Sequence, residues 1–207
     1  MNYHNITYPD MNNGSGLRVV LWCSACSHHC VGCQNPQTWD ANSGIPFDEK
    51  AKEELFKELD KDYISGLTLT GGDPLHEANL DCILDIVTEF NKRYRITQDI
   101  VLDNDKDHNI LNENSNKIRL LKPQKTIWLY SGYEYKHIFR GTPSCLSKEG
   151  YNNYKRRKII EAVDVFVDGR YIESQRDVSL KWRGSKNQHV IDIKKSLEQN
   201  KMVLYCD

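Results

Sequence analysis

The sequence predicts an α/β fold in which mostly parallel strands form a partial, open (β/α) barrel. Apolar runs alternate with amphipathic helical stretches, and such alternation implies parallel strands joined by right-handed crossovers. Loops rich in cysteine, glycine or aspartate follow several of the apolar runs directly. The chain has 207 residues, fewer than the roughly 250 of a closed eight-fold barrel. We therefore expect one domain over residues 1–207 whose barrel does not close.

The strands are predicted from apolar runs bounded by turn residues. Residues 1–16 are expected to form a flexible lead-in that ends in Asn13-Gly-Ser-Gly16. Residues 17–22 are almost continuously apolar, as in a strand buried on both faces of a parallel sheet. Further strands are expected at residues 66–70, 100–102, 125–130 and 163–167, and apolar segments at 190–193 and 202–205 close the chain.

The helices are predicted from apolar residues at helical spacing. Asp48 is placed to cap a helix whose inner face carries Ala51, Leu55 and Leu59. A helix is also expected over residues 80–90, and another near 151–162 that contains the basic run 155–158. That run is either a solvated face or a docking surface for a partner.

A polar stretch separates the two halves of the chain. Residues 103–117 hold five asparagines and several charged residues with little apolar content. We expect a solvated insertion over about residues 103–122.

The chemistry centres on Cys26-Ser-His-His-Cys30-Val-Gly-Cys33, which follows the first predicted strand. A chain spans at most about 3.6 Å per residue, so the three sulfurs can converge on one small centre. Three cysteines are one fewer than a closed zinc site or a ferredoxin-type cluster uses. They suit a [4Fe–4S] cluster held at three irons, with the fourth iron open to another ligand.

Cys23 allows two other interpretations of this stretch. With Cys23 the pattern also fits a structural zinc site in a non-catalytic binding module, although zinc ribbons usually separate their two cysteine pairs by about 12–20 residues. Here only Ser27, His28 and His29 separate the pairs. A thioredoxin-like pair, Cys23 and Cys26, would leave the other two cysteines unexplained. We expect Cys23 to be a residue at the end of a strand rather than a ligand.

A second motif, Gly71-Gly-Asp-Pro74, follows its predicted strand without a spacer. Glycines let the backbone approach a ligand closely, and proline fixes the turn. The carboxyl ends of parallel strands lie on one face, where active sites are built. We therefore expect this turn to meet the cysteine loop, together with the loops at 131–133 and 168–169.

These motifs resemble the activating proteins of anaerobic (class III) ribonucleotide reductases, a family of radical S-adenosylmethionine (SAM) enzymes. The resemblance rests on residues 14–20, 26–39, 71–76, 126–133, 163–169 and 177–188, which span most of the chain. The last block, Asp177-Val-Ser-Leu-Lys-Trp-Arg-Gly-Ser185 with Asn187-Gln188, distinguishes this family from other radical SAM proteins.

The resemblance implies reductive cleavage of SAM to methionine and a 5′-deoxyadenosyl radical, which removes a hydrogen from a glycine of the reductase. It makes three residues the cluster ligands: Cys26, Cys30 and Cys33. The segment expected against the adenine is Gly32, Cys33 and Gln34. The turn expected at the methionine end is Gly71, Gly72, Asp73 and Pro74, with Asp73 orienting the ammonium group. No side chain is expected to act as a general acid or base, because the cofactor carries the chemistry.

The resemblance also implies partners. These are the anaerobic ribonucleotide reductase and a low-potential electron donor such as a flavodoxin or ferredoxin. The alternative is an activating enzyme for another glycyl radical enzyme, such as pyruvate formate-lyase. Candidate docking residues are Tyr133, Lys181, Trp182 and Arg183; Arg183 is alternatively a partner of the SAM carboxylate or a solvated residue.

Composition limits the kinds of partner and the cellular compartment that we expect for this protein. The formal net charge of −1 gives no global field that favours nucleic acid or a membrane. No apolar run approaches the roughly 20 residues of a membrane span, and residues 1–16 lack the features of a signal peptide. Seven cysteines, three of them clustered, fit a reducing cytoplasm better than a disulfide framework.

Overall fold

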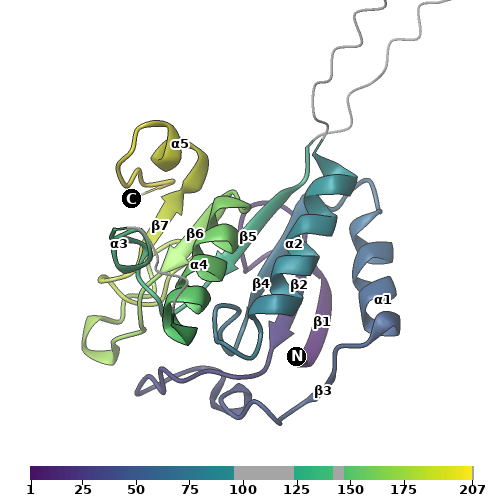
Figure 1. Cartoon of the computed structure of the whole chain (residues 1–207), viewed down its shortest axis with the longest axis horizontal. Helices are drawn as coiled ribbons and strands as arrows, with labels where there is room; N and C mark the ends of the chain where they lie inside the picture. The colour runs from purple at the N-terminus through teal and green to yellow at the C-terminus, as the bar shows by residue number, and fades with distance from the viewer. Residues whose placement is uncertain (96–123, 142–146, 207) are drawn as a thin grey trace, which may run out of the picture.

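The computed structural model describes residues 1–95, 124–141 and 147–206. These residues form a mixed α/β fold around one seven-stranded sheet with the strand order β3-β1-β2-β4-β5-β6-β7 (Figure 1). The strands are β1 (Asn2–Asp10), β2 (Arg18–Cys23), β3 (Ile45–Pro46), β4 (Gly66–Gly71), β5 (Thr126–Tyr130), β6 (Val165–Asp168) and β7 (His189–Asp192). The helices are α1 (Glu49–Leu59), α2 (Leu80–Tyr94), α3 (Tyr135–Ile138), α4 (Lys148–Glu161) and α5 (Ile193–Glu198), with 3₁₀ turns at Pro36–Thr38 and Glu173–Gln175.

The centre of the sheet is parallel and its edges are antiparallel. β2, β4, β5 and β6 pair in parallel, whereas β1 pairs antiparallel with β2, and β7 with β6. β3 and β7 end the order without pairing to each other, so the sheet is open. The predicted α/β class and the unclosed parallel centre are confirmed, while the radical SAM type of partial barrel stays a prediction. The expected strand at 100–102 and the insertion at about 103–122 lie outside the described residues.

The prediction of a flexible lead-in over residues 1–16 is wrong for its first part, because Asn2–Asp10 forms strand β1. Tyr3 pairs with Cys23 and Ile6 with Leu21 across an antiparallel ladder. These two apolar side chains of β1 are only 8% and 7% exposed, so the strand is anchored by few residues. Its polar residues are half-buried or exposed, and its two buried apolar residues stand three positions apart, which is why no clear apolar pattern appeared in the sequence.

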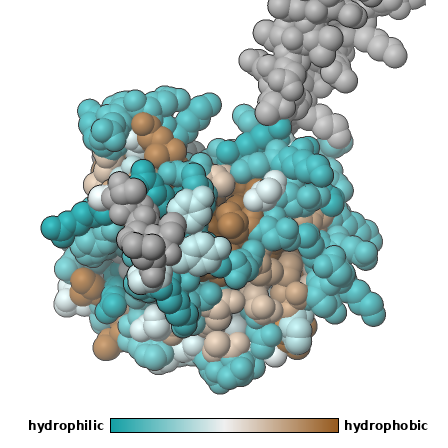
Figure 2. Space-filling view, viewed as in Figure 1, coloured by the Kyte–Doolittle hydropathy of each residue, from teal (hydrophilic) through white to brown (hydrophobic). Residues whose placement is uncertain are grey.

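Helices α1, α2 and α4 cover one face of the sheet (Figure 1). The helix-side core includes Leu55 of α1, Phe90 of α2 and Ile159 of α4, all fully buried. The predicted cap of α1 is confirmed, because the Asp48 side chain accepts a hydrogen bond from the Ala51 amide at 3.0 Å; α2 and α4 run Leu80–Tyr94 and Lys148–Glu161, against the expected 80–90 and 151–162. The outer surface of these helices is mainly hydrophilic (Figure 2). No helix in the described ranges is both long enough and apolar enough to cross a membrane.

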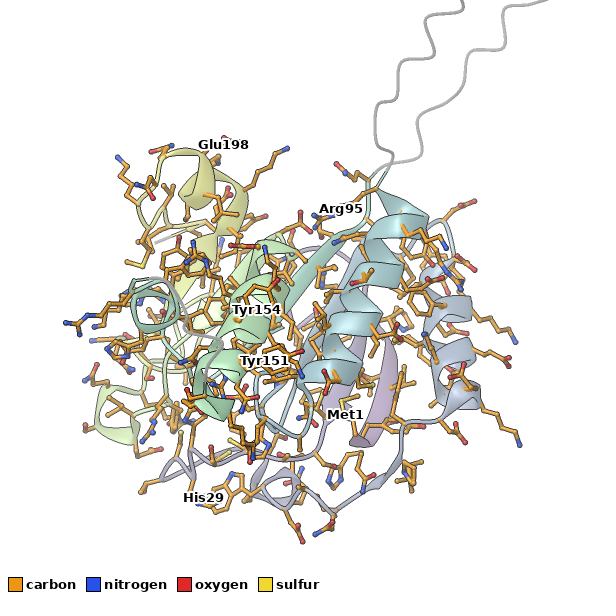
Figure 3. All side chains as sticks on the ribbon, in the orientation of Figure 1. Met1, His29, Arg95, Tyr151, Tyr154 and Glu198 are labelled. Carbon is orange, nitrogen blue, oxygen red and sulfur yellow. The ribbon has the colours of Figure 1, made fainter. Side chains whose placement is uncertain are left out.

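The basic run on α4 is neutralised within the chain. Lys155 pairs with Asp81, Arg156 with Glu149, and both Arg157 and Lys158 with Glu161. Tyr151 and Tyr154 stack on the same helix with ring centroids 6.4 Å apart (Figure 3). The run is therefore engaged in ion pairs, which does not support its alternative use as a basic docking surface.

The opposite face of the sheet carries a smaller apolar cluster and one buried cation. Trp128 of β5 packs there with Val165, Val167 and Val190. Arg18 is fully buried beside them, with its guanidinium 5.6 Å from the centre of the Trp128 ring. Burial lowers the pKa of Arg18 to about 10, so it remains charged at neutral pH.

The Arg18 guanidinium ties β2 to its parallel neighbour β4 and to β5, the next strand beyond it. It donates to the Thr68 hydroxyl at 2.6 Å, to the Leu67 carbonyl at 2.6 Å and to the Thr126 carbonyl at 2.8 Å. The planar fork of arginine reaches all these acceptors at once, which the single ammonium of lysine cannot do.

We predict that Arg18→Lys lowers the free energy of unfolding by roughly 2–4 kcal/mol, because buried acceptors lose their donors. Urea denaturation measures this loss. The matched control is Arg93→Lys, since Arg93 pairs with Glu89 on the surface of α2; it is expected to cost about 0.5 kcal/mol or less. Equal losses in the two variants would contradict the structural role of Arg18.

Candidate functional site

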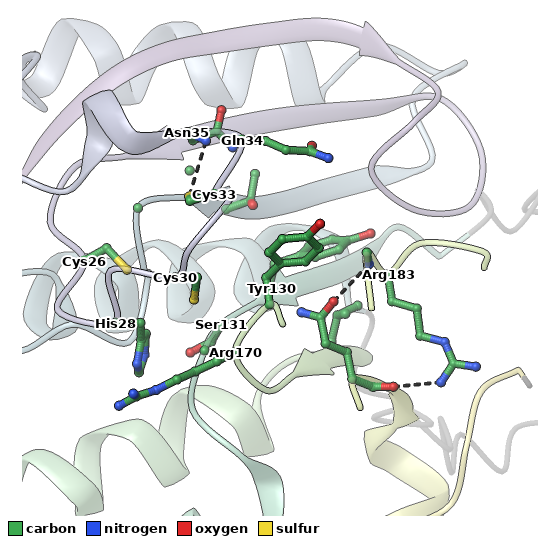
Figure 4. Close-up of a pocket in the computed structure, with 18 of the residues that line it drawn as sticks. Cys26, His28, Cys30, Cys33, Gln34, Asn35, Tyr130, Ser131, Arg170 and Arg183 are labelled. Atoms are coloured by element: carbon green, nitrogen blue, oxygen red, sulfur yellow. Dashed lines mark hydrogen bonds between the residues drawn. The ribbon is translucent and has the colours of Figure 1, made fainter. Parts of the chain in front are cut away.

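A cavity of about 400 Å³ opens at the carboxyl ends of the central strands (Figure 4). Its wall includes residues from the loops that follow β2, β4, β5 and β6: Cys26, Gly72, Gly132 and Gly169 among them. These segments are far apart in the sequence. The parallel topology brings them together, as expected for strand ends on one face of a sheet.

Three of the four clustered cysteines line this cavity. Cys26, Cys30 and Cys33 are free, partly buried thiols in its wall. Cys23 instead ends β2 with its side chain fully buried in the helix-side core. The expectation that Cys23 is a residue at the end of a strand is confirmed, and the cavity holds a set of three thiols.

The arrangement of these thiols bears on the kind of metal site. Within the described residues, no three His, Cys, Asp or Glu side chains are grouped so that they could hold a metal ion. Thiolates on one zinc ion lie within about 4.6 Å of each other, because each Zn–S bond is about 2.3 Å. The ligands of a four-iron cluster bind different irons and stand further apart. Three thiols in the wall of one cavity, with Cys23 buried elsewhere, are a donor set that fits a cluster with one open iron better than a closed four-cysteine zinc site.

Burial favours the protonated form of two of these thiols, Cys26 and Cys30. It raises the pKa of Cys26 to about 11 and also raises the pKa of Cys30. Metal binding by thiols requires the deprotonated form, so loading of such a site releases protons.

The cysteine loop is held in an unusual backbone conformation. Its amides are bonded at both ends, from Cys26 to the Trp39 carbonyl at 3.0 Å and from Cys33 to the Cys30 carbonyl at 3.1 Å. Ala25, His29 and Gly32 have φ angles of 71°, 46° and 75°. Glycine suits this left-handed region, which explains why Gly32, rather than a larger residue, precedes the last cysteine.

The Gly-Gly-Asp-Pro turn is bonded directly to the start of the cysteine loop. The Gly72 amide donates to the Cys23 carbonyl and the Asp73 amide to the Ala25 carbonyl, both at 2.7 Å. A Cβ atom on Gly72 would lie 2.6 Å from the Ala25 oxygen, so no larger residue fits. Gly71 and Gly72 line the cavity, whereas Asp73 and Pro74 are buried behind its wall.

Asp73 is 1% exposed and its carboxylate is already engaged. It accepts hydrogen bonds from the Leu75 amide at 2.8 Å, the Ser131 hydroxyl at 2.8 Å and the Gly132 amide at 3.1 Å. The sequence suggested that this carboxylate meets the ammonium group of a ligand. In the structure the carboxylate bonds to two of the loops that form the cavity wall, and its contact with a ligand stays a prediction.

His28 is a site residue that the sequence did not single out. Its Nε2 lies 2.7 Å from Oδ2 of Asp73, and its ring meets the Tyr133 ring edge-to-face at 4.8 Å. The sequence offered one signal, since His28 stands between two of the three clustered cysteines. Without the fold, however, it is only a spacer residue.

The remaining wall is aromatic and cationic. Tyr130 lines the cavity with a buried hydroxyl that finds no hydrogen-bond partner among the described residues, and burial raises its pKa above the usual range. Trp182 lines it too, packed edge-to-face on Trp128 at 4.9 Å. Arg183 donates to the Gln188 carbonyl at 2.7 Å, and Arg170, which the sequence did not single out, lies exposed at the rim.

The four predicted docking residues divide between the interior and the surface. Lys181 is exposed and Arg183 is half-buried in the cavity wall. The Tyr133 hydroxyl accepts a hydrogen bond from Arg156, and Trp182 packs into the inner cluster. Tyr133 and Trp182 therefore each have contacts within the chain.

A match to a known protein family agrees with an iron–sulfur cluster as the group that these cysteines hold. A family model described as a 4Fe-4S single cluster domain matches residues 12–116 and 107–191. Proteins named anaerobic ribonucleoside-triphosphate reductase-activating protein are similar over nearly the whole chain. The one from Escherichia coli (strain K12) is 32% identical over 192 residues, which cover 92% of this chain and 97% of the relative.

Two other relatives carry the same name. The protein from Enterobacteria phage T4 is 34% identical over 190 residues, covering 92% of this chain and 93% of its own length. That from Pasteurella multocida (strain Pm70) is 32% identical over 190 residues, covering 91% and 95%. On this likeness, and with a three-cysteine loop at the expected strand end, the chain belongs to the family of anaerobic ribonucleoside-triphosphate reductase-activating proteins.

Proposed function

We propose that this protein activates an anaerobic ribonucleotide reductase by reductive cleavage of SAM at a [4Fe–4S] cluster held by Cys26, Cys30 and Cys33. The observation that carries the proposal is the meeting of this three-thiol loop with the Gly71-Gly72 turn on one cavity. The bound cluster and SAM supply one-electron cleavage to methionine and a 5′-deoxyadenosyl radical, which takes a hydrogen atom from a glycine and leaves a glycyl radical.

The residues of the chain position the cofactor and exclude water. The backbone of Gly32, Cys33 and Gln34 is proposed to lie against the adenine. Gly71 and Gly72 are proposed to approach the methionine end through their backbone. Asp73 and Pro74 then fix the shape of that turn from behind the wall. A cavity with aromatic walls keeps water from the radical.

The partner is proposed to reach the cavity from its open rim. A hydrogen atom transfers only at van der Waals contact, so the glycine-bearing loop of the reductase must enter the mouth. We propose that Lys181 and Arg183 meet that loop, together with the exposed edges of Tyr133 and Trp182. The electron comes from a low-potential donor such as a flavodoxin or ferredoxin, in the reducing cytoplasm that the cysteine usage indicates.

The first prediction concerns the cluster ligands. Protein purified anaerobically and reconstituted should contain about four irons and four sulfides per chain. Single alanine substitutions at Cys26, Cys30 or Cys33 should abolish SAM cleavage, because each removes one anchor of the cluster. Iron and sulfide analysis, with 5′-deoxyadenosine measured by chromatography, checks both statements.

Cys23→Ala is the matched control, since its sulfur lies in the core and not in the cavity. This variant should keep both the cluster and SAM cleavage. Loss of the cluster in Cys23→Ala would refute the three-ligand assignment. Stoichiometric zinc without sulfide in the wild-type protein would refute the proposed function.

The second prediction concerns the turn at the proposed methionine end. Gly72→Ala should weaken SAM binding by about tenfold or more at unchanged cluster content, because the new Cβ pushes the turn away from the Ala25 carbonyl. Gly141→Asn is the control, because asparagine tolerates the φ of 70° at that position and a Cβ there meets no atom of the described residues within 4 Å. Titration of the loaded proteins with SAM compares the two; equal affinities would place Gly72 outside the SAM site.

The third prediction identifies the partner, because a fold alone does not name a substrate. A mixture of this protein, a class III reductase, SAM and a strong reductant should show a glycyl radical doublet by electron paramagnetic resonance. Replacement of the radical glycine of the reductase by alanine should remove the signal. SAM cleavage without that signal, but with a radical on pyruvate formate-lyase, would assign the protein to the other class of activating enzyme.

A further inference from the structure

His28 lies between two of the proposed cluster ligands, yet its ring contacts other loops (Figure 4). Its side chain is 6% exposed, and Nε2 stands 2.7 Å from Oδ2 of Asp73, whose side chain is 1% exposed. The ring also meets Tyr133 at 4.8 Å and fills the space in which Gly132 would carry a Cβ atom. The side chain therefore joins the cysteine loop to the loops after β4 and β5.

Asp73 is the meeting point of these loops. The same carboxylate that faces His28 accepts hydrogen bonds from Leu75 in its own turn and from Ser131 and Gly132 after β5. His28 is its contact with the cysteine loop. Movement of the imidazole would therefore be transmitted through one carboxylate to the turn that carries Gly72.

Arg156 braces the same assembly from helix α4. Its Nε donates to the Leu75 carbonyl at 3.0 Å, and its NH2 group donates to the Tyr133 hydroxyl at 2.9 Å. Its guanidinium also lies 4.3 Å from the centre of the Tyr133 ring. Tyr133 is thus held in place behind His28, and the imidazole is confined between a fixed ring and a fixed carboxylate.

Stability alone does not account for a histidine at this position. The contact to Asp73 is short but poorly directed, and within the part of the chain that the structure describes neither ring nitrogen of His28 has a hydrogen bond of good geometry. Unpaired polar atoms are costly to bury, so an apolar side chain of similar size would suit a purely structural role better. His29, the next residue, is exposed and packs on Trp39 instead (Figure 3).

We propose that His28 is a positioning residue that sets the Gly71-Gly72 turn against the cysteine loop through the carboxylate of Asp73. The inference rests on the proposed function, since this turn is the segment proposed to hold the methionine end of SAM. His28 itself touches neither cluster nor SAM in this role. It fixes the distance between the loop that holds the cluster and the turn that holds the ligand.

The first test measures SAM binding at matched cluster content. His28→Leu removes the contact to Asp73 at similar volume, whereas His28→Gln places an amide donor near the position of Nε2. His29→Asn is the control, because asparagine tolerates the positive φ of that position. We expect the dissociation constant for SAM to rise roughly tenfold in His28→Leu, to recover most of the way in His28→Gln and to stay unchanged in His29→Asn.

The second test does not need the cluster or SAM. Urea unfolding of the unloaded chain is compared for wild type, His28→Leu, Asp73→Asn and the double variant. Residues in direct contact have non-additive effects. We expect His28→Leu to change the unfolding equilibrium constant about fivefold or more in the wild-type background, and less than about twofold when Asp73 is already asparagine.

The outcomes separate this inference from the proposed function. Additive unfolding effects, or a SAM affinity of His28→Leu equal to that of His29→Asn, would overturn the positioning role while leaving the cluster assignment intact. A His28→Leu variant that loses stability but binds SAM normally would show a merely structural histidine and would also overturn it. Failure of the wild-type protein to bind SAM would instead refute the proposed function, and the unfolding cycle would still decide whether His28 and Asp73 are coupled.

Discussion

The parallel register of β2 against β4 places Cys23 opposite Gly71, and the arrangement of the whole site depends on it. In this register the strands end together, so the cysteine loop and the Gly-Gly-Asp-Pro turn leave the sheet side by side. Two further amide-to-carbonyl bonds, from Gly72 and Asp73, continue the pairing beyond the strands. A slip of one residue would exchange the faces of every side chain, turning Trp22 away from the cavity and the sulfur of Cys23 toward it.

The same alternation divides the molecule into two chemical environments. Ile127 and Leu129 of β5 enter the helix-side core, whereas Trp128 and Tyr130 belong to the opposite face. That opposite face is polar at one end, where Arg18 is buried among carbonyl and hydroxyl oxygens. The cavity lies toward the other end, where Trp22 and Tyr130 line the wall. The length of the strands therefore separates the structural charge from the site at which chemistry is proposed, although both lie on the same face of the sheet.

The polar contacts behind the cavity show how a small domain builds a rigid wall from loops. Loops are usually more mobile than the strands they connect. Here a buried carboxylate, Asp73, bonds to two loops and lies against a third, while Arg156 fixes the outer side from a helix. Groups held in this way are positioned before a ligand arrives, which reduces the cost of ordering them on binding.

The features that the sequence determined by itself are local ones. The three-cysteine loop, the Gly-Gly-Asp-Pro turn and the helix that begins after Asp48 were all predictable, because each depends on residue type and short spacing. The alternation of strands and helices also predicted the α/β class and the meeting of several loops on one face. Strand β1 was missed because Tyr3 and Ile6 are its only deeply buried apolar residues, so no period of two appeared. The contact between His28 and Asp73 was decided by tertiary structure alone. Their contact joins loops from different strands, and only the register and crossovers of the sheet bring an imidazole within 2.7 Å of a carboxylate so distant in the sequence.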